Sequence, residues 1–417
     1  MTKKECCEKL LIMGCSIGSE DALVYAKDLG IYTIVTDFYS PEKNKLKLCA
    51  DEYWMIDVAD IETLEKKCRE EGITGVFAAT DEFCLDKTKE LCGRLGLPFY
   101  ASEEGWAAAR NKEIFKQYCL ECGLNVPQKY EIDEKTLEVC PSDISWPVIV
   151  KPVDSTAQRG LSICNNKAEL EKGYKHALEY SKSKKAIIEE YIEGMEMGVG
   201  YIFDQGTPVL VEVCPYVCAN VNGRDKFVYC AMKCEADEDY LKAVGPKVEN
   251  LFRHMHCMHG TAFIQIKKKG DKYYFIEMNY RLDGSGSWYI GEQLKNENIL
   301  KYLVDYALGH EPKWKKTEKG FKGYNAGGTY GTWTQAGKIA KIEGVEKVKE
   351  MEGVRILFQR FREGDIIPDT VSMDQMSFYI CIVAENEEKI KEKLQKMKNI
   401  LAIYNEEGEN MLIWYGI

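Results

Sequence analysis

Over the first hundred residues, short apolar runs alternate with amphipathic helical patterns. The apolar runs have the length of buried strands and lie at Leu10–Met13, Tyr32–Thr36 and Gly75–Ala79. Apolar residues at helical spacing predict helices at Glu20–Leu29, Ile61–Glu71 and Glu82–Leu95. Strands that alternate with helices predict a small parallel α/β domain, which we place at residues 1–105.

The carboxyl ends of these strands are a candidate ligand site, because parallel α/β sheets bind ligands beyond that edge. Gly14–Gly18, Asp37 and Asp81 lie there. The glycine run lacks the full G-x-G-x-x-G pattern, so a tight turn without a ligand explains it at least as well. The interpretation of the chain as a nicotinamide-dependent dehydrogenase rests on this run alone and leaves the later motifs unexplained.

The middle of the chain places a lysine beside a loop of small and hydroxyl residues. A helix opens at Lys112, and the run WPVIVKP then predicts a buried strand that ends with Lys151. In the loop Val153–Gly160, free backbone N–H groups can cradle a polyphosphate, with Lys151 as counter-charge. A lone lysine at a strand end is usually a solvated charge, but its place beside this loop favours phosphate binding.

Residues 186–203 predict a strand, a short connector and a second strand. A connector backbone can offer one acceptor and one donor to the edge of adenine, and a carboxylate can accept both ribose hydroxyls. Glu196 is the candidate for the ribose contact, although as a surface glutamate it would be unremarkable.

The stretch FIEMNYRLDGSGSW carries the strongest chemical pattern of the chain. In an extended strand Glu277, Asn279 and Arg281 share one face. The other face carries Ile276, Met278 and Tyr280. A turn at Gly270–Lys272 would place Gln265 opposite Glu277. The pattern thus offers oxygen ligands suited to Mg²⁺ and a guanidinium for an oxyanion, whereas an exposed polar strand face is the ordinary alternative.

The remaining segments predict further strands and helices. Two or three strands fall within 206–234, a long helix at Asp237–Met258 packs behind the hairpin, and Ser287–Gly309 is helical. After a lysine-rich linker and a glycine-rich stretch, strand and helix patterns recur at Val354–Phe361, Ser377–Val383 and Glu387–Asn399. These predict a small C-terminal α+β domain at residues 311–417.

Charge and cysteine content narrow the class of protein. A net charge of −11 argues against a nucleic-acid or anionic-membrane binder, and no apolar run reaches membrane-spanning length. The 17 scattered cysteines are typical of reduced thiols in a cytoplasmic protein. Residues 1–19 predict a first strand and no signal peptide.

A zinc site is the competing interpretation of the histidine-rich segment. His254, His256 and His259 follow the upstream cysteines Cys214, Cys218, Cys230 and Cys234. The histidine spacing does not place three ligands on one helical face, so packed soft residues at a helix end are favoured.

Taken in order, Lys112, WPVIVKP with its loop, IIEEYIEGME, FIQI and IEMNYR resemble the motifs of the ATP-grasp superfamily. The resemblance covers essentially the whole chain. It implies an N-terminal pre-ATP-grasp domain and a central ATP-grasp domain at 106–310 of two α+β subdomains, with the clamp at about 125–190. The C-terminal domain would be similar to that of biotin carboxylase.

The resemblance also implies residue roles. Lys112 and Lys151 would hold the α- and β-phosphates, and Arg281 and Lys151 would act in catalysis. The nucleotide site would be completed by Ser155, Thr156, Gly160, Glu189, Glu190, Tyr191, Ile192 and Glu196, with the backbones of Glu189 and Ile192 at the adenine edge. The metal ligands would be Gln265, Glu277 and Asn279. Many relatives have an acidic residue in place of Gln265 and more glycines in the phosphate loop.

The implied activity is that of an ADP-forming ligase that uses ATP and Mg²⁺ or Mn²⁺. A carboxylate would be activated as an acyl phosphate and joined to an amine, with an amino acid or small peptide as one partner. The substrate border would include Arg224, Gly284, Ser285 and Ser287. Two other functions stay open: a bicarbonate-using carboxylase or carbamoyl phosphate synthetase-like enzyme, and a catalytically silent ATP-binding regulatory protein. A homodimer also stays open as the form of assembly.

Overall fold

The computed structural model describes residues 8–132, 144–153, 160–221, 224–233, 238–314, 320–369 and 373–416. Its first part is a parallel four-stranded sheet in the order β3-β2-β1-β4. The elements are β1 Lys9–Met13, α1 Ser19–Asp28, β2 Tyr32–Thr36, α2 Leu46–Cys49, β3 Glu52–Trp54, α3 Ile61–Glu71, β4 Gly75–Phe77 and α4 Glu82–Leu95. The predicted parallel α/β fold is confirmed, with the added edge strand β3.

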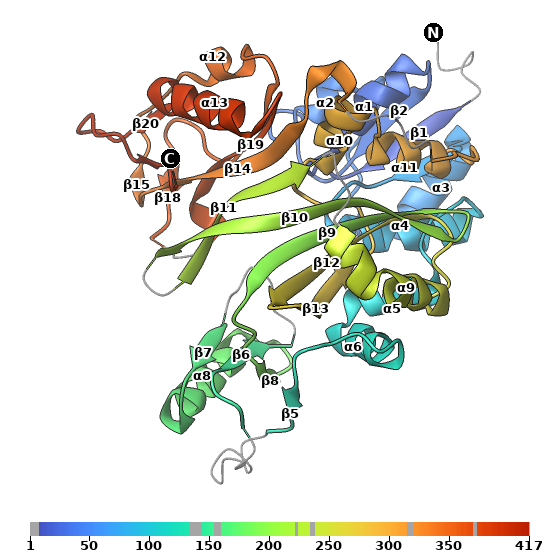
Figure 1. The fold of residues 1–417 in the computed structure, drawn as a ribbon. Helices are drawn as coiled ribbons and strands as arrows, with labels where there is room; N and C mark the ends of the chain where they lie inside the picture. Colours follow the sequence, from blue (N-terminus) through green and yellow to red (C-terminus); the bar gives the residue numbers. More distant parts are fainter. Residues whose placement is uncertain are drawn as a thin grey trace.

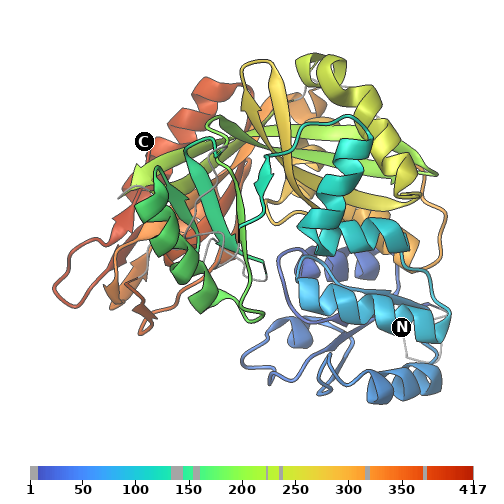
Figure 2. The same ribbon diagram turned by 90° about the horizontal axis from the view of Figure 1, so that it is seen from below.

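A second, small sheet follows two helices, α5 Glu103–Arg110 and α6 Lys112–Glu121. This small sheet is antiparallel and has the order β5-β8-β6-β7, with β5 Lys129–Tyr130, β6 Val148–Pro152, β7 Ser162–Cys164 and β8 Ala186–Glu190. Helix α8, Lys167–Tyr180, covers one face and buries Leu170 against Val148 and Ile188 (Figure 2). In Figure 1 the small sheet lies below the rest of the molecule.

The large sheet is antiparallel and runs β13-β12-β9-β10-β11-β14-β19-β17, with β21 beside β14. Its strands are β9 Met195–Asp204, β10 Thr207–Val221, β11 Arg224–Lys233, β12 Gly260–Lys269, β13 Lys272–Asn279, β14 Ala326–Thr334, β17 Val354–Gln359, β19 Met376–Ala384 and β21 Leu412–Ile413. Because β11 pairs with β14, the predicted C-terminal strands extend this sheet and form no main sheet of their own.

Helices and small strands complete the fold. They are α9 Glu238–His254, α10 Ser287–Lys295, α11 Ile299–Ala307, η1 Phe321–Gly323, β15 Gly337–Lys338, β16 Lys341–Glu343, α12 Val345–Lys349, β18 Ile366–Ile367, η2 Met373–Gln375, α13 Glu387–Ile400 and β20 Ala402–Tyr404. The predicted helix Ser287–Gly309 is in fact two helices. Asn296 takes a left-handed φ of 56° that ends α10, and Asn298 caps the next helix by accepting from Lys301 N.

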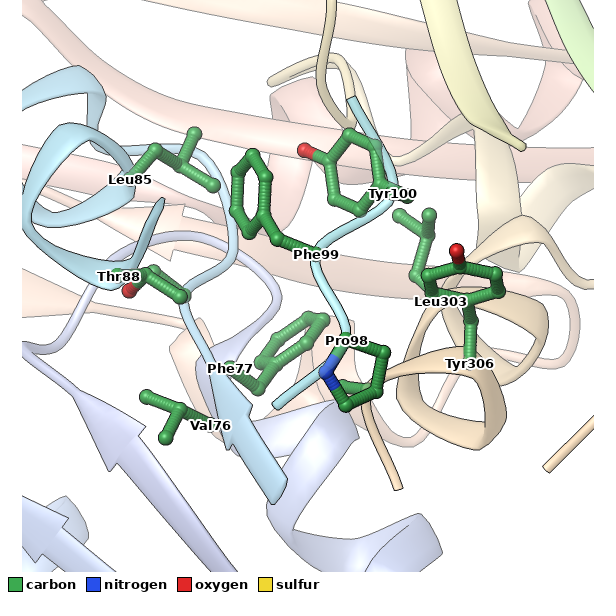
Figure 3. A pocket seen from close by; sticks show the side chains of 11 residues that line it. Val76, Phe77, Leu85, Thr88, Pro98, Phe99, Tyr100, Leu303 and Tyr306 are labelled. Carbon is green, nitrogen blue, oxygen red and sulfur yellow. The ribbon is translucent and has the colours of Figure 1, made fainter. Parts of the chain in front are cut away.

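A small apolar pocket separates the first domain from α11 (Figure 3). It is lined by Val76, Phe77, Ala78, Leu85, Thr88, Pro98, Phe99, Tyr100, Leu303, Tyr306 and Ala307. None of these residues is a predicted site residue, so we interpret the pocket as a packing gap. Across the described ranges, no helix is both long and apolar enough to span a membrane.

Because Gly260 has no side chain, Tyr100 of the first domain can pack closely against the large sheet. The φ of Gly260 is +91°, and an added Cβ would lie 2.3 Å from Cδ2 of Tyr100. The Tyr100 hydroxyl in turn donates to the carbonyl oxygen of Tyr280 at 3.2 Å. We expect Gly260→Ala to lower the free energy of unfolding by about 3 kcal/mol, because backbone strain adds to overpacking.

Gly270 supplies the matched control for this prediction. It also has a positive φ, +59°, but an added Cβ would meet nothing within 4 Å. Gly270→Ala should therefore cost only the backbone strain, about 1 kcal/mol. Urea unfolding followed by tryptophan fluorescence measures both losses, and equal losses would contradict the packing argument.

Candidate active site

The hairpin of β12 and β13, called here the metal hairpin, has the predicted pairing at Gln265, but its turn is shorter than predicted because Lys272 pairs with Lys269. Gln265 lies opposite Glu277, and Phe263 lies opposite Asn279. Met278 and Tyr280 are buried at 2% and 1% exposure, while Glu277 and Asn279 are half-buried. The polar and apolar faces therefore separate as predicted around Glu277.

Ile276 is a correction to this strand pattern. The ladder pairs Ile266 with Phe275 and Gln265 with Glu277, so Ile276 is the extra residue of a β-bulge. Phe275 takes the buried position instead, with 0% exposure, and Ile276 is half-buried. The bulge changes the alternation locally, which a strict period of two could not predict.

Arg281 connects the metal hairpin to the first domain. Its guanidinium donates to Leu282 O at 2.9 Å and to Asn279 Oδ1 at 3.4 Å, and it pairs with Glu82 Oε1 at 3.2 Å. Glu82 is the first residue of α4, just beyond β4. The carboxyl edge of the first sheet therefore reaches the site, but through a residue that sequence analysis missed.

The residues predicted at that edge have local structural contacts. Asp37 is 4% exposed and pairs with Lys47 at 2.7 Å, and Asp81 caps α4 by accepting from Cys84 N at 2.9 Å. Gly14 donates its N–H to Thr36 O at 2.9 Å and takes a left-handed φ of 75°. These contacts fit the tight-turn interpretation of Gly14–Gly18.

Lys112 faces the metal hairpin from the first position of α6. Asn111 begins this helix by accepting hydrogen bonds from Glu113 N and Ile114 N. Lys112 Nζ lies 2.6 Å from Glu277 Oε2. An ammonium at this distance shows that the Glu277 carboxylate faces a position suited to a cation.

Lys151 and Lys116 both pair with the Glu189 carboxylate. Lys151 Nζ lies 2.8 Å from Glu189 Oε2, and Lys116 Nζ bonds Oε1. Burial alone would raise the pKa of Glu189, but the two lysines lower it overall. Lys116 was missed by sequence analysis, although its spacing of four residues from Lys112 places both on one helical face.

The predicted adenine connector lies beside β8. Glu190 N donates to Gln128 O at 2.8 Å and Tyr191 N to Pro147 O at 3.0 Å, so these two amides bind within the protein. Ile192 is buried at 2% exposure. Glu196 accepts a hydrogen bond from Gln265 Nε2, which connects the predicted ribose residue to the predicted metal residue.

The predicted phosphate loop is described only at its end. Ser155 and Thr156 lie outside the described residues. Gly160 has a φ of 76°, and an added Cβ would lie 2.7 Å from Pro152 Cγ and 2.8 Å from Tyr180 Cβ. The backbone therefore passes here too closely for a side chain.

The predicted substrate border surrounds a buried carboxylate. Ser287 Oγ donates to Asp283 Oδ1 at 2.6 Å, and Ser285 Oγ bonds Asp283 Oδ2. Burial, with Asp283 nearby, raises the pKa of Glu212 to about 8. An added Cβ at Gly284 would meet nothing within 4 Å. The Arg224 side chain lies outside the described atoms.

The histidine-rich segment does not converge on one point. His254 Nδ1 lies 3.4 Å from Cys122 Sγ, and His256 Nδ1 lies 3.4 Å from Glu104 Oε1. The ring of His259 packs against Tyr306 at 4.8 Å between centroids. Within the described ranges, which omit Cys234, no three His, Cys, Asp or Glu side chains form a group that could hold a metal.

The donor set of the metal hairpin fits Mg²⁺. Glu277 offers a carboxylate, and Asn279 and Gln265 offer amide oxygens from adjoining strands. Hard oxygen donors of this kind, completed by substrate phosphates, are what Mg²⁺ prefers. Glu277, which pairs with the ammonium of Lys112, is the negatively charged member of this donor set.

Comparisons with known proteins identify a domain in the middle of the chain. Residues 144–288 match the model of the ATP-grasp domain. The chain is 27% identical to a formate-dependent phosphoribosylglycinamide formyltransferase of Prochlorococcus marinus over 44% of the chain and 48% of that protein. It is 21% identical to dapdiamide A synthase of Enterobacter agglomerans over 95% of the chain and 96% of that protein.

The fold is shared with solved structures. An L-amino acid ligase from Bacillus licheniformis superposes with a TM-score of 0.75 at 19% identity, over 96% of this chain and 99% of that one. At this identity the likeness concerns the fold. The chain spans about half the length or less of several curated relatives that it matches. Residues 144–288 therefore form an ATP-grasp domain, as the ordered motifs predicted, within a chain whose fold is shared with this solved structure.

Proposed function

We propose that this protein is an ATP-dependent, ADP-forming carboxylate–amine ligase, with an amino acid or small peptide as one substrate. One observation carries the proposal: Gln265, Glu277 and Asn279 lie together on the metal hairpin, Arg281 just beyond it bonds Asn279, and Lys112 pairs with Glu277 from a separate helix. The alignment with dapdiamide A synthase over nearly the whole chain supports an amide-forming reaction.

The nucleotide would be bound between the metal hairpin and the small sheet. Lys112 and Lys151 supply positive charge to the phosphates from these two sides. Glu196 would accept from the ribose hydroxyls, and the backbone near Ile192 would contact adenine. Mg²⁺, held by Glu277, Asn279 and Gln265, would neutralise phosphate charge when bound.

The reaction requires no protein nucleophile. A substrate carboxylate oxygen attacks the γ-phosphorus, the bond to the β-phosphate oxygen breaks, and ADP leaves. An amine nitrogen then attacks the acyl carbon of the acyl phosphate, inorganic phosphate leaves, and the nitrogen loses a proton. Arg281, oriented by Leu282 O and Asn279, places a guanidinium beside the developing charge of the acyl phosphate.

The domain limits are part of the proposal. Residues 1–105 form the pre-ATP-grasp domain, 106–310 the ATP-grasp domain with its clamp at about 125–190, and 311–417 the C-terminal segment. The small sheet and α8 fall within the proposed clamp. The C-terminal strands and α13 pack in an apolar cluster that includes Tyr330, Phe378 and Leu394.

A trapping screen tests the activity. The full chain is incubated with ATP, Mg²⁺, hydroxylamine and single carboxylates, chiefly amino acids and dipeptides, with bicarbonate as a separate arm. Hydroxylamine captures an acyl phosphate as a hydroxamate, so the activated acid is found without its natural amine. We expect hydroxamate and ADP in equal amounts with at least one amino acid or peptide.

Two outcomes of this screen would contradict the proposal. ADP release with bicarbonate alone would indicate a carboxylase or carbamoyl phosphate synthetase-like enzyme. ATP binding without ADP release across a broad panel of acids and amines would indicate a regulatory ATP-binding protein.

A further inference from the structure

Two lysines share one buried carboxylate where α6 meets the small sheet. Glu189, on β8, has 4% side-chain exposure, and its two oxygens bind the ammonium groups of Lys151 and Lys116. The lysine side chains are 13% and 10% exposed. This buried group, which we call the Glu189 triad, therefore carries one net positive charge.

An ordinary structural ion pair does not explain that surplus. One cation is enough to neutralise a buried carboxylate, whereas a second ammonium adds a desolvation penalty and repels the first. Lys112, one turn away on α6, pairs with Glu277 and does not relieve this repulsion. An anion bound beside Lys151 would offset the surplus, and a polyphosphate is such an anion.

The two lysines occupy different positions and therefore have different roles. Lys151 stands on β6, at the strand end that leads into the proposed phosphate loop. Lys116 lies inside α6, is 8% exposed as a residue, and reaches Glu189 across the boundary between α6 and the small sheet. Lys151 is therefore placed to contact a ligand, and Lys116 is placed to contact Glu189.

We propose that Lys116 is a positioning residue of the nucleotide site, a role that rests on the proposed function. Its ammonium neutralises the Glu189 carboxylate, so that the charge of Lys151 is available to a polyphosphate. Without Lys116, Glu189 takes Lys151 as its sole partner, and Lys151 presents little net charge to the nucleotide. Lys116 acts through Glu189 and does not touch the phosphates.

The protonation of Lys116 gives this role a pH signature. Burial lowers the pKa of Lys116 to about 8, the charge of Lys151 adds to the decrease, and Glu189 opposes it. These groups face Lys116 from β6 and β8, and Lys112 acts on it from the same helix. Nucleotide affinity should therefore be full below that pKa and fall as the pH rises through it.

Calorimetric titration of the full chain with AMP-PNP in excess Mg²⁺ tests this, at pH values on either side of the Lys116 pKa. The wild type should lose about tenfold in affinity from the lower to the higher pH, the effect expected for one charge contact. In Lys116→Arg the cation stays protonated, so the affinity should change by less than about threefold.

Two further variants separate positioning from simple loss of packing. Lys116→Met should bind about tenfold more weakly at the lower pH. The double variant Lys116→Met, Glu189→Gln also removes the carboxylate that Lys116 neutralises. Its affinity for AMP-PNP should therefore return to within about threefold of wild type. Lys129→Met is the matched control, because Lys129 lies opposite Glu189 on β5 but pairs with the exposed Glu113 and Glu131.

The outcomes distinguish this inference from the proposed function. A wild type that does not bind AMP-PNP would contradict the ligase proposal itself, and the role of Lys116 with it. A wild type that binds would leave that proposal standing. The positioning role would then be overturned by Lys116→Met binding normally, by a double variant that stays weak, or by an unchanged pH dependence in Lys116→Arg.

Discussion

Replacement of Glu277 with glutamine is expected to reduce kcat by about a thousandfold, the upper range for loss of one preorganised electrostatic group. Glutamine keeps the shape of the side chain but removes the charge that pairs with Lys112 at 2.6 Å and that would hold Mg²⁺. Steady-state ADP release with the acid found in the trapping screen measures the loss.

The fold should survive this substitution. The Glu277 and Lys112 side chains are 28% and 40% exposed, so their ion pair should contribute no more than about 1 kcal/mol to stability. Asp271→Asn, at the exposed turn of the same hairpin, is the matched control and should retain full activity. A fully active, folded Glu277→Gln variant would contradict the assignment of the metal hairpin.

Replacement of Arg281 with lysine is expected to lower kcat by about a hundredfold while the KM for ATP changes little. The guanidinium reaches Leu282 O, Asn279 and Glu82 at once, and a lysine ammonium cannot reproduce that planar arrangement. A residue that acts on the acyl phosphate should affect the chemical step more than nucleotide binding. Full initial-rate kinetics with ATP and the acid varied separate the two parameters.

Arg110→Lys provides the control for Arg281. Arg110 also pairs with Glu82, at 3.3 Å, but lies on α5 and bonds Asp86 as well. If Arg281 matters only because it anchors Glu82, the two lysine variants should lose similar activity. A loss confined to Arg281 supports its place beside the reacting groups, whereas a raised KM for ATP with normal kcat would assign it to nucleotide binding.

The local spacing of apolar and polar residues was enough to predict much of the secondary structure of this protein. Strands β1, β2 and β4 of the first sheet, the helix from Lys112 and the face shared by Glu277 and Asn279 follow from side-chain spacing within a few residues. The pairing of Gln265 with Glu277 was predicted from a turn at Gly270–Lys272, but the structure has a shorter turn, with Lys272 paired to Lys269, and the bulge at Ile276 brings Glu277 opposite Gln265. Such features need no knowledge of distant segments.

Contacts between distant segments depended on the tertiary structure. The bond from Lys116 to Glu189 spans 73 residues, and that from Arg281 to Glu82 spans 199. Neither pair has a spacing that marks it in the sequence, because its members meet only when α6 packs beside the small sheet and the first sheet beside the metal hairpin. The joining of β11 to β14, which continues one sheet into the C-terminal segment, is decided in the same way. Side-chain alternation therefore predicted candidate site residues such as Glu277 and Asn279, whereas packing between separate segments decided which charged side chains lie together.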